Sequence, residues 1–201
     1  MKKRFKKIYL EITNICNLKC NFCPGNNRIK QEMPLETFKT ILPKLKDYTD
    51  YLYFHLMGEP LVHSHINEFI NTATTNFNFK VNITTNGYLI KKIEDNHNIH
   101  QLNISLQAIK NDEEIDNYLK NIFTAVDKLH KQGTIIVYRL WNEQASSNKI
   151  VEKLEKHYKI KLNGDNKIQD GIYLDREIPF IWPDLNNTYY TEAGSCMGLR
   201  S

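Results

Sequence analysis

Short apolar runs alternate with amphipathic segments along nearly the whole chain, and this alternation most constrains the fold. β-branched and aromatic runs predict strands at residues 7–13, 51–56, 80–85, 101–106 and 134–141, with a further strand within 171–182. Strand–helix alternation predicts an α/β fold with a parallel sheet and crossover helices. An open doubly wound sheet and a barrel both fit, and both collect function at the carboxyl ends of their strands.

Stripes of apolar residues at helical spacing predict the helices between these strands. Pro34 suits the first turn of the first helix, and we expect Pro43 to kink or shorten it. Gly133 is expected to end the clearest helix. Residues 161–170 read as a polar loop. The stripes are Phe38, Ile41, Leu42 and Leu45; Ile66, Phe69, Ile70 and Ala73; Ile115, Leu119, Ile122, Phe123, Val126 and Leu129; and Ile150, Val151, Leu154 and Tyr158.

Three cysteines lie within eight residues, directly after the first predicted strand. Cys16, Cys20 and Cys23 form a C-x3-C-x2-C run. Iron–sulfur clusters are held by cysteine thiolates, and three local thiolates leave one iron of a four-iron cluster open to a small molecule. Zinc is the alternative, but zinc sites usually present C-x2-C pairs and need four ligands. A disulfide would leave one thiol over and suits a reducing compartment poorly.

Polar residues follow the next three predicted strands. Gly58, Glu59 and Pro60 form a turn after the second strand, where glycine permits close backbone approach. Asn86 follows the third strand in a Thr-Thr-Asn-Gly sequence that is also an everyday turn. Ser105 and Gln107 flank Leu106 at the end of the fourth strand, and their side chains suggest a lined cavity.

Arg139 is a cation within the otherwise apolar fifth strand. A charge in such a strand needs a partner. A neighbouring carboxylate and an anionic group of a bound ligand both fit.

Together these segments resemble the radical S-adenosylmethionine (radical SAM) superfamily. The resemblance covers about residues 7–195 and is carried by Cys16, Cys20, Phe22 and Cys23, in a C-x3-C-x-aromatic-C pattern. Gly58, Glu59 and Pro60 match the Gly-Gly-Glu-Pro-like loop of the family, although Met57 replaces its first glycine. Asn86 and Ser105 fall where family members line the SAM pocket.

The resemblance implies a partial (β/α)6 TIM-like barrel with parallel strands, a [4Fe-4S] cluster on Cys16, Cys20 and Cys23, and SAM on the open iron. Reductive cleavage of SAM would yield a 5′-deoxyadenosyl radical that abstracts hydrogen from a substrate. The implied SAM contacts are Phe22 at the adenine, Gly58, Glu59 and Pro60 at the methionine ammonium, Asn86, Ser105 and Gln107 at the ribose or carboxylate, and Arg139 at the carboxylate.

The C-terminal residues resemble the entry to a cysteine-rich extension of the SPASM type. Cys196 lies in a Cys-Met-Gly-Leu-Arg segment, and residues 180–183 resemble what precedes such an extension. We therefore expect a basic tail at 1–7, a radical SAM core at 8–185 and a truncated extension at 186–201. This favours a peptide or protein substrate, and the electron donor implied is a flavodoxin or ferredoxin.

Charge and hydropathy narrow the classes of function. The net charge is +4, and residues 1–7 contribute five positive charges, so we expect no nucleic-acid partner. No segment has the length of a membrane span, and we expect a cytoplasmic protein.

Two alternatives stay open. One is a non-catalytic iron–sulfur or zinc electron-transfer module whose fourth ligand is His55, His63 or Cys196. The other is an enzyme remnant that binds SAM without turnover.

Overall fold

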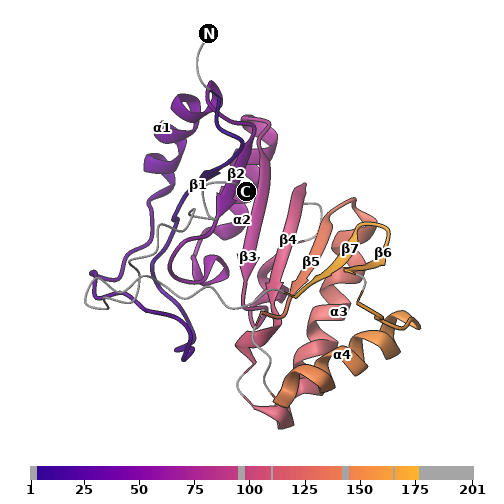
Figure 1. Ribbon diagram of the computed structural model, residues 1–201. Coiled ribbons are helices and arrows are strands. Elements are labelled where there is room, and N and C mark those ends of the chain that lie inside the picture. Colours follow the sequence, from indigo (N-terminus) through magenta and orange to yellow (C-terminus); the bar gives the residue numbers. More distant parts are fainter. Residues whose placement is uncertain (1–3, 95–97, 110, 142–144, 165, 177–201) are drawn as a thin grey trace, which may run out of the picture.

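The computed structural model describes residues 4–94, 98–109, 111–141, 145–164 and 166–176. Seven strands in these ranges form one sheet in the order β1-β2-β3-β4-β5-β7-β6 (Figure 1). All neighbouring pairs are parallel except β6–β7. The strands are Ile8–Tyr9 (β1), Tyr51–Phe54 (β2), Lys80–Thr85 (β3), Ile99–Ser105 (β4), Ile135–Arg139 (β5), Lys167–Gln169 (β6) and Ile172–Asp175 (β7).

The order confirms the predicted α/β class and parallel sheet. Six parallel strands follow one another in chain order, and β1 and β6 remain edges, so the sheet is that of a partial barrel. Four α-helices connect the strands: Leu35–Lys46 (α1), Ile66–Asn71 (α2), Ile115–Lys131 (α3) and Ala145–Tyr158 (α4). Between β3 and β4 the described residues contain a short 3-10 helix, Ile90–Lys92 (η3), and no α-helix.

The two faces of the sheet differ in chemistry. On one face, alternate strand residues share a single apolar core with the helices. There the ring centroids of Phe38 in α1 and Phe54 in β2 lie 5.7 Å apart. At the other end α3 and α4 lie side by side (Figure 1), with the rings of Phe123 and His157 stacked 3.9 Å apart. The intervening strand residues include Asn82 and Asn103, both buried. Because parallel sheets are usually apolar on both faces, these buried amides distinguish this face from the one that packs on the helices.

Two helices differ from their predictions. α1 passes through Pro43 and ends at Lys46, because Leu42 and Leu45 pack on the core on either side of the proline. α2 ends at Asn71, and the chain continues as a π-helical turn over Thr72–Asn76 that includes the predicted Ala73.

Two strands also differ from their predictions. β1 has only two residues, because the chain after Leu10 pairs instead with the segment around Glu32. The predicted loop 161–170 contains β6, an edge strand in which Ile168 alone is buried, so it carries no apolar pattern.

Some predictions lie outside the described residues. These are the segment 180–183, the extension at 186–201 with Cys196, and residues 1–3 of the basic tail. Among the helices that are described, none combines the length and the apolar character that a membrane crossing requires.

Candidate active site

The three cysteines lie on the loop that connects β1 to α1, at the carboxyl end of β1 as predicted. Cys16 and Cys23 are exposed, Cys20 is half-buried, and all three are free thiols. The Leu18 and Gly25 backbone N–H groups each donate to a cysteine Sγ, those of Cys16 and Cys23 respectively, at 3.4 Å. Two of the three sulfurs, those of Cys16 and Cys23, therefore already accept hydrogen bonds from local N–H donors.

The thiols influence one another's ionisation. Burial raises the pKa of Cys20, and the neighbouring Cys16 and Cys23 raise it further. Burial also raises the pKa of Cys16, and the nearby Glu59 and Cys23 raise it further. The hydrogen bond from the Leu18 N–H has the opposite effect and lowers this pKa. The contributions that the cysteines make to one another's pKa reflect the proximity of their sulfurs. Bound metal would favour the thiolates and reverse this balance.

The donor set suits an iron–sulfur cluster better than a single metal ion. Within the described ranges, no three His, Cys, Asp or Glu side chains converge closely enough to hold one ion. A cubane cluster instead takes one thiolate at each of several corners. Three free thiols on one loop fit that requirement.

The turn after β2 packs directly against the start of the cysteine loop. Gly58 has φ of +88°, and a Cβ there would lie 2.6 Å from the Thr13 carbonyl oxygen and 2.8 Å from that of Ile15. The Glu59 backbone N–H donates to the Ile15 carbonyl at 2.8 Å. Only glycine allows this approach, so residue 58 fixes where the chain enters Cys16.

The Glu59 carboxylate is 2% exposed and already has three donors. Oε1 accepts from the Leu61 N–H at 3.0 Å and from Thr85 Oγ1 at 2.7 Å, and Oε2 accepts from the Asn86 N–H at 2.7 Å. Burial raises the pKa of Glu59, while these three hydrogen bonds lower it. The side chain therefore joins the ends of β2 and β3.

Asn86 joins the end of β3 to the cysteine loop. Its Nδ2 donates to Asn17 Oδ1 at 2.8 Å, and its Oδ1 accepts from the Tyr88 N–H at 3.1 Å. The Tyr118 hydroxyl of α3 donates to the Asn86 carbonyl at 2.7 Å. Two of the predicted site loops are thus bonded to the residues on either side of Cys16.

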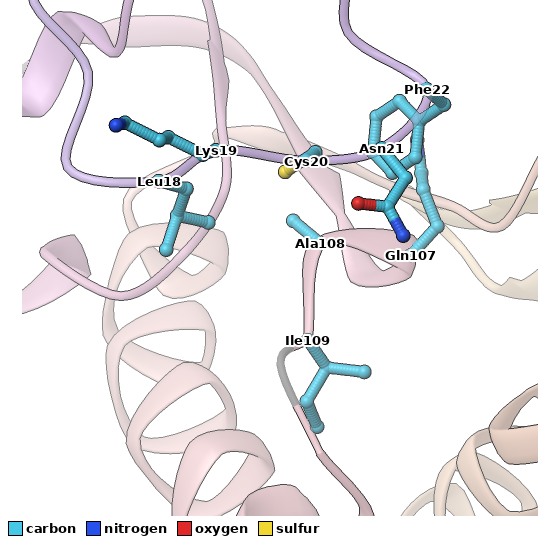
Figure 2. A pocket seen from close by; sticks show the side chains of 8 residues that line it. All are labelled: Leu18, Lys19, Cys20, Asn21, Phe22, Gln107, Ala108 and Ile109. Atoms are coloured by element: carbon cyan, nitrogen blue, oxygen red, sulfur yellow. The ribbon is translucent and has the colours of Figure 1, made fainter.

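A cavity of about 320 Å³ lies between the cysteine loop and the turn after β4. Figure 2 shows the Cys20 sulfur among its lining side chains, with the Lys19 ammonium directed away from the others. Phe22 is 40% exposed, and Gln107 is 8% exposed with its Oε1 buried and without a hydrogen-bond partner among the described residues. The cavity therefore offers an aromatic face and an amide oxygen ready to accept a hydrogen bond.

Ser105 and Arg139 are partners in the register of β4 and β5, at the same carboxyl edge. The Arg139 guanidinium lies 4.9 Å from the Trp141 ring centroid, and Asp175 of β7 is its neighbour on the other side. Burial, with the Arg139 cation nearby, lowers the pKa of His55 to about 4, so this imidazole is neutral at physiological pH. The predicted Ser105, Gln107 and Arg139 thus share one edge of the sheet.

Sequence reasoning did not single out Glu11 or Asn14. Glu11 accepts hydrogen bonds from Arg28 and from the Met57 N–H, and Asn14 contacts the far arm of the cysteine loop. The available signal was that Glu11 and Asn14 are, with Thr13, the polar residues in the otherwise apolar run 8–15 that leads to Cys16.

Two known proteins are similar in sequence to part of this chain. An uncharacterized protein of Methanocaldococcus jannaschii is 30% identical over 57% of this chain and 42% of its own length. GTP 3′,8-cyclase of Vibrio parahaemolyticus is 25% identical over 79% of this chain and 49% of its own length. This chain thus spans about half or less of both relatives.

A solved structure shares the fold. SuiB of Streptococcus suis bound to S-adenosylmethionine superposes with a TM-score of 0.59 over 92% of this chain and 42% of SuiB, at 17% identity. The sequence pattern of the radical SAM superfamily, whose members use SAM and a [4Fe-4S] cluster, matches residues 10–142, more than half of the chain. The chain belongs to the radical SAM superfamily.

Proposed function

We propose that this chain is the core of a radical SAM enzyme. Cys16, Cys20 and Cys23 would hold a [4Fe-4S] cluster. The cluster, when reduced, supplies the electron that splits bound SAM into methionine and a 5′-deoxyadenosyl radical, which abstracts hydrogen from the substrate. Residues 8–185 would form this core.

One observation carries the proposal. The turns after β2 and β3 are both hydrogen-bonded to residues that flank Cys16, through Glu59 to Ile15 and through Asn86 to Asn17. Two strand ends therefore support one thiol-bearing loop, itself the continuation of β1, beside a cavity. Such a rigid scaffold suits a cofactor that must be oriented rather than merely bound.

The chain's own residues divide into two groups in this proposal. Phe22, Ser105 and Gln107 would contact SAM, with Gln107 Oε1 accepting a hydrogen bond and Phe22 covering the adenine. Arg139 would face the carboxylate. Gly58, Glu59, Pro60 and Asn86 would shape the methionine end, chiefly through backbone groups, because the Glu59 and Asn86 side chains already have protein partners.

The substrate and partners are proposed from a fold neighbour and from the C-terminal sequence. SuiB, which shares this fold, was solved with its precursor peptide SuiA bound. That likeness and the SPASM-like residues around Cys196 support a peptide or protein substrate. A flavodoxin or ferredoxin would supply the electron, and a cytoplasmic location suits the oxygen-sensitive cluster.

The test is anaerobic reconstitution with iron and sulfide. Electron paramagnetic resonance of the reduced chain, with and without SAM, and mass spectrometry for 5′-deoxyadenosine provide the readouts. We expect a cluster signal that shifts with SAM, and 5′-deoxyadenosine as product. Cys20→Ala should lose the cluster, whereas Ile29→Ala, an exposed change on the same loop, should keep it. A cluster whose signal ignores SAM would contradict the proposal.

The structure argues against His63 as the fourth protein ligand of a non-catalytic module. His63 Nε2 lies 3.1 Å from the Met33 carbonyl oxygen, and its Nδ1 accepts from the His65 N–H at 3.1 Å. Both ring nitrogens are therefore engaged. A cluster that retains four protein ligands in the reconstituted chain would revive this alternative.

A further inference from the structure

Asn14 lies two residues before Cys16, where the chain enters the cysteine loop. Its side chain is 6% exposed and pairs with the arm of the loop that returns after Cys23. Nδ2 donates to the Ile29 carbonyl at 2.8 Å, and Oδ1 accepts from the Gln31 N–H at 2.8 Å. The Asn14 backbone N–H also donates to the Gln31 carbonyl at 3.2 Å. One residue thus pairs with two alternate residues of the returning arm.

After residue 31 the returning arm has other bonds, from the Met33 N–H to the Ile12 carbonyl at 2.8 Å and from Ser64 Oγ to Glu32 at 2.6 Å, so the segment that depends most on Asn14 is residues 27–31. Residues 27–31 are all exposed, and the Ile29 side chain is 79% exposed, so apolar burial contributes little there. Closing a loop and ordering its residues costs conformational entropy. Hydrogen bonds at the base of the loop must offset that cost.

The other bonds at this base are weaker candidates. The Arg28 guanidinium contacts both carboxylate oxygens of Glu11, Oε1 at 2.7 Å and Oε2 at 2.9 Å. The Arg28 side chain is half exposed, however, and ion pairs in water contribute little to stability. Thr13 Oγ1 donates to the Gln31 carbonyl at 3.1 Å. The Asn14 amide alone makes two short, sheltered bonds.

We infer that Asn14 is a positioning residue, whose side-chain amide closes the cysteine loop and holds Cys16, Cys20 and Cys23 in place before any cluster is bound. The consequence for the cluster rests on the proposed function. The closure itself does not, because it concerns hydrogen bonds of the apo chain.

The test compares the apo wild type with Asn14→Ala by amide hydrogen exchange of a peptide that covers residues 26–33. Exchange should become at least about tenfold faster, the change that corresponds to the loss of a hydrogen bond worth about 1.4 kcal/mol. Peptides of β3, β4 and α3 should exchange as in the wild type. Asn14→Asp, which keeps an acceptor for Gln31 and loses the donor to Ile29, serves if the alanine variant does not fold.

Asn67→Ala is the matched control. The Asn67 amide makes the same pair of bonds far from the cysteines, donating to the Lys92 carbonyl at 2.8 Å and accepting from the Glu94 N–H at 3.3 Å. It should leave exchange at 26–33 unchanged. After reconstitution, Asn14→Ala should bind less iron per chain and show a broadened cluster resonance, and Asn67→Ala should match the wild type in both.

The outcomes separate the two proposals. Wild-type exchange at 26–33 in both Asn14 variants would overturn the positioning role, as would wild-type iron content and resonance in Asn14→Ala. A wild-type chain that binds no cluster would defeat the proposed function, while the exchange experiment would still decide whether Asn14 closes the loop.

Discussion

At the scale of one residue, Gly58 is the position in the site where a side chain would have the least room. Gly58→Ala must place a Cβ 2.6 Å from the Thr13 carbonyl oxygen at a φ of +88°. Left-handed strain and crowding together should lower the free energy of unfolding by about 3 kcal/mol, measured by urea denaturation. Gly133→Ala is the control, with a φ of +94° and open space around it, and should cost only about 1 kcal/mol. Equal losses would mean that the crowding at Gly58 is unimportant.

At the scale of elements, Thr85 ties β3 to the turn after β2 by donating to Glu59. Thr85→Val removes this donor from a buried carboxylate, so the folded pKa of Glu59, already raised by burial, rises further. Because the pKa of Glu59 in the folded state lies above its unfolded value, the free energy of unfolding falls as the pH rises through the folded pKa. The variant should therefore lose about 2 kcal/mol relative to the wild type at about pH 8, and less at about pH 5.

Thr84→Val tests the origin of this pH dependence. Thr84 is the neighbouring residue in β3, but its hydroxyl accepts from Asn103 Nδ2 and contacts no carboxylate. Urea unfolding at the two pH values should show a constant cost for Thr84→Val. A cost that varies equally in both variants would rule out Glu59 as the cause.

The elements also show what the sequence could and could not predict. Helix stripes and the central strands were predictable, because burial on one core imposes their periodicity, as for Leu119 and Ile122 in α3. The three-residue β6 was not, since one buried isoleucine leaves no pattern. The cysteines could be identified from their spacing in the sequence. The role of Asn14 could not, because its hydrogen-bond partners lie fifteen and seventeen positions away and only the fold brings them together.

At the scale of the whole molecule, the three cysteines lie outside the apolar core. The buried apolar cluster includes strands β2 to β7 and all four α-helices but none of the three cysteines. The two ends of the loop pack on the core through Ile12 and Met33. The part of the loop around Cys16 is held by hydrogen bonds at the sheet edge, from the Glu59 N–H to Ile15 and from Asn86 to Asn17. We therefore expect a chain whose fold does not depend on metal, unlike small metal-dependent domains that are unfolded without it.

Replacing Cys16, Cys20 and Cys23 together by serine tests this independence. Because Cys16 and Cys23 are exposed and Cys20 is half-buried, the unfolding free energy should stay within about 1 kcal/mol of the apo wild type. Ile122→Ala, which truncates a fully buried residue of α3, should instead cost about 3 kcal/mol. Far-ultraviolet circular dichroism during urea unfolding measures both. Loss of the folded state in the serine variant would show that the sheet depends on the cysteine loop for its stability.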